Sequence, residues 1–290
     1  MKNPEEAFLH TGARKFEEGV LKKRLYERAQ EVFRVTPPLD PNKFRDVPGY
    51  QNAEIDEDLE YVRDKEQTFE REDTPEKREQ KKFAKILEAM LNELIELYDW
   101  LGPNATIITT SDFDDIKNGV DMVAEFRDEE EQSASHLALA VDVTFASEIG
   151  KKIDRIKREI ERGEMASIRY FESEFLESKG ELPNIPRVVI GIDTDTITNL
   201  GALWLAEDKK ALAVHEMQKV ILVEIRMQLE VFAKYARTKG QEKIAATYDA
   251  TREVIEGILE EKKGVLAKAP VRDRVFGAIQ REVGHLQREM

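Results

Sequence analysis

The stretches GVDMVAEF (residues 119–126) and HLALAVDVTF (residues 136–145) are two apolar segments that each carry one aspartate, Asp121 and Asp142. Their composition is typical of β-strands, and the short acidic connection between them predicts a hairpin. A carboxylate in a buried strand costs free energy unless a positive partner compensates it. A divalent cation is one such partner. For either aspartate alone, the alternative explanation is a turn or edge position where its carboxylate is satisfied without a metal. Two of them on paired strands favour a site.

The flanking sequence extends this pattern in both directions. Thr74 and Pro75 form a helix start, an N-cap residue followed by proline at the first helical position. Apolar residues at helical spacing follow, and Gly102-Pro103 ends the helix. In chain order the pattern predicts a helix at 76–99, strands at 105–110, 119–126 and 136–145, a helix at 147–162, and strands at 166–171 and 187–192.

This order of elements, with the two aspartates, resembles the core of the PD-(D/E)xK nuclease superfamily, over about residues 76–193. The resemblance implies an α/β (α+β) fold with a restriction-endonuclease-like mixed sheet and an αβββαβ core. It implies that Asp121 and Asp142 hold Mg²⁺ or Mn²⁺, with the backbone carbonyl of Val143 as a further ligand. The bound metal would activate water and stabilise charge on a phosphate. Ala138 and Ala140 share the face of Asp142 by strand alternation, and their small size predicts space there for metal and phosphate.

The motif lysine is the main departure from the family pattern, because this chain has Thr144 at that position. In some members of the superfamily the amine comes from the following helix. Lys152 is the best candidate here, on the flank of the isoleucine stripe and near the predicted helix start. The alternative is that Lys152 covers apolar surface with its alkyl chain. Arg169 on the next strand is a weaker candidate.

Further acidic residues extend the predicted site. In many relatives the first helix supplies a glutamate, and Glu93 is favoured because Glu88 is expected to point further toward solvent. Asp115 precedes the predicted Asp121 strand and is a candidate ligand, although turn chemistry alone explains an aspartate there. Asp193 also lies in a metal-like stretch, but N-capping of the helix that follows is the simpler explanation.

Composition limits the alternatives. The 290-residue chain has no cysteine, which excludes disulfides, thiolate nucleophiles and cysteine-ligated zinc. The net charge of −14 argues against a general nucleic-acid coating protein. A local basic cluster on the predicted helix after Asp142 leaves room for phosphate contacts, or is a solvated face: Lys151, Lys152, Arg155, Lys157 and Arg158. The sequence shows no signal peptide and no apolar run of about 20 residues, so we expect a cytoplasmic protein with no membrane partner.

The chain divides into three predicted regions. Residues 1–74 read as a helix from about Pro4 to Phe33 followed by a proline-containing acidic linker or arm with little core, at most one short helix. Residues 75–206 form the nuclease-like domain, and residues 207–290 a helical region that begins with one long helix from about Asp208 to Thr238.

Two functions remain open from the sequence. The first is a metal-dependent nuclease that hydrolyses phosphodiester bonds, with DNA as the expected substrate and Asp121, Asp142 and Lys152 as catalytic residues. The second is a catalytically inactive nuclease-like protein that binds a partner through its helices, which Thr144 and the acidic charge favour. A homo-oligomer is a further open alternative, since many enzymes of this type pair to cut two strands.

Overall fold

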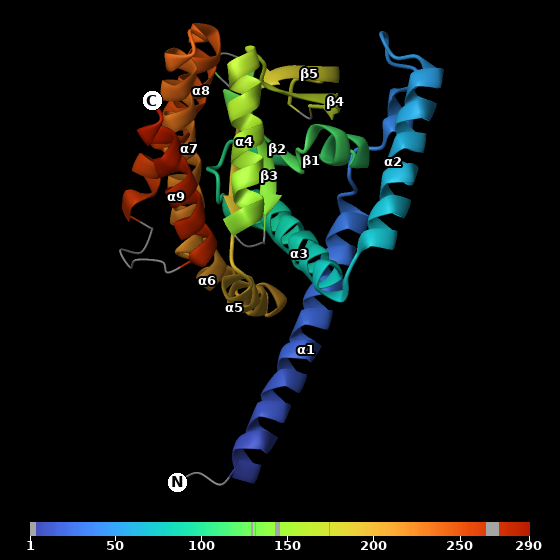
Figure 1. Ribbon diagram of the computed structural model, residues 1–290, viewed down its shortest axis with the longest axis vertical. Helices are drawn as coiled ribbons and strands as arrows, with labels where there is room; N and C mark the ends of the chain where they lie inside the picture. Colours follow the sequence, from blue (N-terminus) through green and yellow to red (C-terminus); the bar gives the residue numbers. More distant parts are fainter. Residues whose placement is uncertain (1–3, 129, 131, 143–145, 174, 265–272) are drawn as a thin grey trace.

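The computed structural model describes residues 4–128, 130, 132–142, 146–173, 175–264 and 273–290, and the side chains of residues 4–16, 140–142 and 146–148 are outside this description. The described chain is a mixed α/β protein with one four-stranded and one two-stranded sheet (Figure 1). The helices are α1 (Pro4–Val35), α2 (Asn52–Glu72), α3 (Pro75–Tyr98), α4 (Ala146–Arg162), α5 (Thr194–Leu205), α6 (Lys209–Ala213), α7 (Met217–Thr238), α8 (Glu242–Glu261) and α9 (Arg274–Arg288). Short helical turns are η1 (Pro41–Phe44), the π-helix η2 (Asp114–Asn118) and η3 (Lys262–Gly264).

The larger sheet has the strand order β1-β2-β3-β6. β1 (Ala105–Thr109), β2 (Met122–Asp128) and β3 (Ser133–Asp142) are antiparallel neighbours, as the predicted hairpin requires. β6 (Arg187–Gly191) runs parallel to β3 and pairs its last residue, Gly191, with Asp142. The smaller sheet pairs β4 (Ala166–Glu172) with β5 (Lys179–Ile185).

The two faces of the larger sheet have different coverings. Met122, Leu137 and Leu139 belong to the main core, which they share with apolar residues of α3, α4, α5 and the C-terminal helices. Val123 and Ala138 belong to a smaller core that the second sheet supplies with Ile168, Phe171 and Ile185. The expectation of open space above the small residues of β3 is therefore wrong at Ala138, because the second sheet packs on it.

Side chains of two helices satisfy backbone groups at both edges of the larger sheet, and such cover protects strand edges from pairing with other chains. On β6, the N–H of Val189 donates to Gln228 Oε1 at 2.9 Å, and Gln228 Nε2 donates to the Val189 carbonyl at 2.7 Å. The N–H of Gly191 donates to Glu224 Oε2 at 3.2 Å. On β1, the N–H of Ile107 donates to Glu96 Oε1 at 2.8 Å. Helices α7 and α3 thus hold the sheet by its edges as well as by its faces.

The helices next to the predicted site begin and turn as the sequence indicates. Thr74 caps α3, since its hydroxyl accepts a hydrogen bond from the N–H of Lys77 at 3.3 Å. The isoleucine stripe of α4 is buried in the main core: Ile149, Ile153, Ile156 and Ile160. The carboxylate of Asp193 caps α5 by accepting from the N–H of Thr196 at 2.8 Å, which confirms the capping explanation for that residue.

The structure corrects three expectations about elements. The segment after α1 is more than a linker, because it contains the 21-residue helix α2, whose Ile55 and Val62 are buried against Phe113 and Tyr170. The strand at 166–171 lies in the second sheet, beside β5, an unpredicted strand. The helix predicted from Asp208 to Thr238 is two helices, α6 and α7.

The N-terminal half of α1 projects away from the rest of the molecule (Figure 1). From Leu25 onward one face of the helix, with Leu25, Ala29 and Val32, is buried against α3 and α5, and Leu25 closely approaches Gly201. No helix of the described chain is both long and apolar enough to cross a lipid bilayer.

Candidate functional site

Three carboxyl groups from three separate elements come together near the start of β2. They belong to Glu88 of α3, Asp115 of the π-helix and Asp121, the residue directly before β2. Asp115 shares a side-chain hydrogen bond with Asp121, and both interact electrostatically with Glu88. We call Glu88, Asp115 and Asp121 the carboxylate cluster.

The backbone of Asp121 is fixed by the neighbouring strands. Its N–H donates to the Leu139 carbonyl at 3.0 Å, and its carbonyl accepts from the N–H of Thr110 at 3.2 Å. The first bond brings the backbone of Asp121 within three positions of Asp142, the last residue of β3. The side chain of Asp142 lies outside the described residues, as do Val143 and Thr144 entirely.

The π-helix that carries Asp115 is anchored by its neighbour in sequence, Asp114. The buried carboxylate of Asp114 accepts from the N–H groups of Arg169 at 2.7 Å and Tyr170 at 3.1 Å, both in β4. It also accepts from Ser111 Oγ at 2.8 Å and Asn118 Nδ2 at 2.6 Å. Short π-helices are rare and occur often at functional sites. Here the unusual turn is supported by four hydrogen bonds to one side chain.

Two amino groups lie beside the carboxylate cluster. Lys85, one turn before Glu88 on α3, donates from Nζ to Glu88 Oε2 at 3.0 Å. Its ammonium group also lies 4.2 Å from the centre of the Phe33 ring. The positive charge of Lys152 on α4 acts on Glu88 as well. The relocated-lysine candidate is therefore near the cluster, and Lys85 is a second amine that the sequence did not single out.

Burial and the charges of neighbouring carboxylates raise the pKa values of Glu88 and Asp115. Glu88 is only 9% exposed, and burial raises its pKa to about 7. Lys85 and Lys152 act against this rise, whereas the charge of Asp121 adds to it. Asp115 keeps exposed surface, yet desolvation of its carboxyl group by the surrounding protein, followed by the charges of Asp121 and Glu88, raises its pKa well above the usual range.

The chemistry of these donors fits a hard divalent cation, since Mg²⁺ and Mn²⁺ prefer carboxylate oxygens. Within the described residues, however, no three acidic or histidine side chains stand in an arrangement ready to hold a metal. The carboxyl groups of Asp115 and Asp121 interact closely, and this interaction raises the pKa of Asp115. A cation bound between them would have to displace the proton that this raised pKa favours.

The positions of Glu88 and Glu93 on α3 differ from those expected from the sequence. The expectation that Glu88 points to solvent is wrong. Glu93, the favoured residue, accepts from Arg28 Nη2 at 2.9 Å and from Trp204 Nε1 at 2.6 Å, so it joins α3 to α1 and α5. Arg169, the weaker cation candidate, pairs with Glu54 and Asp58 of α2.

One signal in the sequence would have pointed to Glu88. Lys85, Glu88 and Asn92 form a polar line at helical spacing within the broad apolar stripe of α3, and both Glu88 and Asn92 are buried. A lysine and a glutamate paired inside an apolar stripe indicate a polar contact with another element. This signal is visible only when the apolar face of the helix is taken as broad enough to include Glu88.

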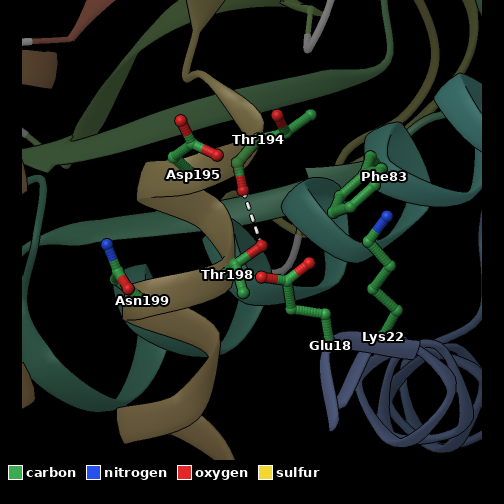
Figure 2. Close-up of a pocket in the computed structure, with 7 residues that line it drawn as sticks. All are labelled: Glu18, Lys22, Phe83, Thr194, Asp195, Thr198 and Asn199. Atoms are coloured by element: carbon green, nitrogen blue, oxygen red, sulfur yellow. Dashed lines mark hydrogen bonds between the residues drawn. The ribbon is translucent and has the colours of Figure 1, made fainter. Parts of the chain in front are cut away.

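Two cavities of the described molecule lie away from the carboxylate cluster. One, of about 290 Å³, is enclosed by Glu18, Lys22, Phe83 and the first turn of α5, as Figure 2 shows. Its charged groups have partners, since Lys22 pairs with Glu79 and Asp195 with Arg274. A second, of about 640 Å³, lies between β1 and the chain after α1. The two glutamates that line the second cavity have partners, since Glu96 accepts from the N–H of Ile107 and Glu172 from Lys179 Nζ.

Comparison of this chain with models of known protein families, with curated proteins and with solved structures gives no match.

Proposed function

We propose that this protein is a metal-dependent nuclease that hydrolyses phosphodiester bonds of nucleic acid, with DNA as the expected substrate. The observation that carries the proposal is the convergence of Glu88, Asp115 and Asp121 with the amines of Lys85 and Lys152. Three carboxyl groups, two of which (Glu88 and Asp115) have raised pKa values, lie next to two amines, and this grouping has no evident role in stability. The Asp121 backbone is hydrogen-bonded to Leu139, three residues before Asp142 on β3.

The order and pairing of the strands add support. Helix α3, the antiparallel strands β1 to β3, helix α4 and the parallel strand β6 follow one another in the order expected of a PD-(D/E)xK core. Relative to that pattern, β4 and β5 form an insertion between α4 and β6. The resemblance is one of topology, and function is argued from the residues of the site.

Each residue of the site has a proposed role. Glu88, Asp115, Asp121 and Asp142 would hold a Mg²⁺ or Mn²⁺ ion, which when bound polarises the phosphodiester and lowers the pKa of water. Lys152 would place positive charge beside the attacked phosphate in place of the lysine that Thr144 replaces. Lys85 keeps Glu88 oriented and offsets part of its charge.

The proposal is tested by cleavage of labelled single-stranded and double-stranded DNA and RNA in Mg²⁺ or Mn²⁺. We expect metal-dependent cleavage that falls by about 100-fold or more in Asp121→Asn and Asp142→Asn, because loss of a direct ligand should cost at least as much as the roughly 10–100-fold loss seen for groups that only orient metal ligands. Asp195→Asn, at an exposed position of α5, is the matched control and should cleave like the native protein. Cleavage that survives both strand variants would contradict the assignment.

A second function is favoured by two specific observations, Thr144 at the motif lysine position and the net charge of −14. In that case the chain is an inactive nuclease-like protein that binds a partner. Absence of cleavage on every substrate, together with no Mn²⁺ binding by calorimetry, would support this function over the nuclease.

A further inference from the structure

Two arginines hold the C-terminal end of the π-helix. Arg187, from β6, donates from Nη2 to the carbonyl of Asn118 at 2.6 Å. Arg155, from α4, donates from Nη2 to the carbonyl of Lys117 at 3.1 Å. The last carbonyls of a helical turn lack intrahelical partners and carry partial negative charge, so guanidinium groups are suitable partners for them.

The two guanidinium groups are joined by one carboxylate. Glu159 Oε1 accepts from Arg155 Nε and from Arg187 Nη1, each at 3.2 Å. We call Arg155, Arg187 and Glu159 the arginine clamp. Arg187 is 3% exposed, and burial lowers the pKa of its guanidinium group. A buried ion pair adds little net stability, because desolvation offsets most of the attraction. The role of this ion pair is therefore better explained by the backbone carbonyls that the two arginines hold.

Contact between the arginine clamp and the π-helix is close because residue 119 is glycine. Gly119 has a φ of +63°, and a Cβ at this position would lie 2.4 Å from Arg155 Nη1. The N–H of Gly119 donates to the carbonyl of Asp115 at 2.9 Å. The residue beside the clamp is therefore bonded directly to the backbone of a member of the carboxylate cluster.

The opposite side of the π-helix is tied to β4 through Asp114, as described above. The π-helix is consequently held from two sides, by β4 on one and by α4 and β6 on the other. Asp115 lies between these anchors, and its carboxyl group meets Asp121. The charge of Asp121 also acts on Arg187.

We propose that Arg155 and Arg187 are positioning residues for the carboxylate cluster: by holding the carbonyls of Lys117 and Asn118 they fix Asp115 against Asp121. Their importance for metal binding rests on the proposed nuclease function. Their hold on the π-helix does not depend on that function. Hydrogen exchange measures this hold, and a separate experiment measures metal binding.

The first experiment is amide hydrogen exchange on the full-length protein without metal, comparing the native chain with Arg187→Met and Arg155→Gln. Arg155 is half-buried, so its variant keeps the test open if loss of the buried Arg187 prevents folding. We expect exchange of the Gly119 and Val120 amides to accelerate about tenfold or more, the scale of a local opening that loses one hydrogen bond to a charged group. Tyr248→Phe is the matched control.

The control separates the clamp from general loosening of β6. The hydroxyl of Tyr248 is buried and accepts from the N–H of Arg187 at 3.4 Å, so its removal weakens the same strand without touching the guanidinium group. We expect Tyr248→Phe to leave exchange at residues 119 and 120 unchanged. Unchanged exchange in both arginine variants, or equal acceleration in Tyr248→Phe, would overturn the inference.

The second experiment measures Mn²⁺ affinity by calorimetry on the same variants and on Arg155→Lys. We expect about tenfold or greater weakening in Arg187→Met and Arg155→Gln, as for loss of other groups that orient metal ligands, and partial recovery in Arg155→Lys. Accelerated exchange with native Mn²⁺ affinity would overturn the positioning role. A native protein that binds no Mn²⁺ would instead overturn the proposed function, and exchange alone would then decide whether the clamp holds the π-helix.

Discussion

The carboxyl groups of Asp115 and Asp121 share a hydrogen bond, although one residue belongs to a π-helix and the other to the start of a strand. Two carboxylates form such a bond only when one of them carries a proton. A proton and a cation therefore compete for the position between these two carboxyl groups. With Glu88 nearby, whose pKa is also raised, the cluster gains most from a bound cation when the solution holds few protons.

Divalent cations should accordingly stabilise the protein more at high pH than at low pH. The folded-state pKa values of Asp115 and Glu88 are raised, so the folded state binds more protons than the unfolded chain, and stability falls as pH rises through those values. At pH 8 a cation at about 100 times its Kd should add about 2.7 kcal/mol, and at pH 5 much less. Thermal unfolding with MgCl₂ or MnCl₂, against NaCl of equal ionic strength, measures the difference. Equal stabilisation at both pH values would contradict the displaced proton.

The two glutamates of α3 should respond in opposite directions to the same substitution. At pH 8, Glu88→Gln removes a buried charge whose pKa is raised to about 7, and we expect stabilisation of about 1–3 kcal/mol. This gain should disappear below pH 4.5, where the carboxyl group is protonated in both states. Glu93→Gln weakens the bonds to Arg28 and Trp204, and we expect destabilisation of about 1–2 kcal/mol.

Urea unfolding gives both free energies, and calorimetry adds an independent comparison. Mn²⁺ affinity should fall in Glu88→Gln and stay native in Glu93→Gln. Loss of Mn²⁺ affinity in Glu93→Gln but not in Glu88→Gln would show that Glu93, and not Glu88, belongs to the metal site.

Gln228 should contribute strongly to stability although it is polar. Its side-chain amide satisfies both the N–H and the carbonyl of Val189 at the buried edge of β6. Gln228→Leu leaves two buried backbone groups without partners, and we expect a loss of about 2–5 kcal/mol in the free energy of unfolding. Lys219→Leu, at an exposed position of the same helix, should change stability by less than about 0.5 kcal/mol. A similar small effect of Gln228→Leu would mean that water reaches this edge.

Gly119 and Arg155 should be energetically coupled. In the native chain Gly119→Ala introduces a side chain at positive φ, which costs about 1–2 kcal/mol, and displaces the Arg155 guanidinium from the Lys117 carbonyl. In an Arg155→Ala background the second cost is absent. A double-mutant cycle from urea unfolding should therefore give a coupling of about 0.5–1.5 kcal/mol. Strict additivity would show that the approach of Arg155 to Gly119 has no energetic consequence.

The sequence by itself determined the elements whose signals are local. The start of α3 at Thr74 and Pro75, the stripe of α4 and the hairpin of β2 and β3 follow from capping chemistry and from the spacing of apolar residues, which depend on near neighbours in the chain. Asp121 could be proposed as a site residue because a charged residue in an apolar pattern is itself a local signal, and Lys152 because the family resemblance directed attention to the flank of the next helix.

Other features depended on contacts between distant segments. Helix α2 was expected to be at most one short helix, because it is strongly charged and buries little more than Ile55 and Val62; the cluster that they join includes the distant residues Phe113 and Tyr170 as well as Phe44. Strands β4 and β6 have similar patterns, and only packing decides that β6 joins the larger sheet while β4 pairs with β5. The choice between Glu88 and Glu93 is of the same kind. Both lie on one helix, and the rotation of α3 against α1 and α5 takes Glu93 to Arg28 and Trp204 and leaves Glu88 beside Asp121. Periodicity specifies the faces of a helix, whereas the neighbour that each face meets is set by the free energy of packing the whole chain.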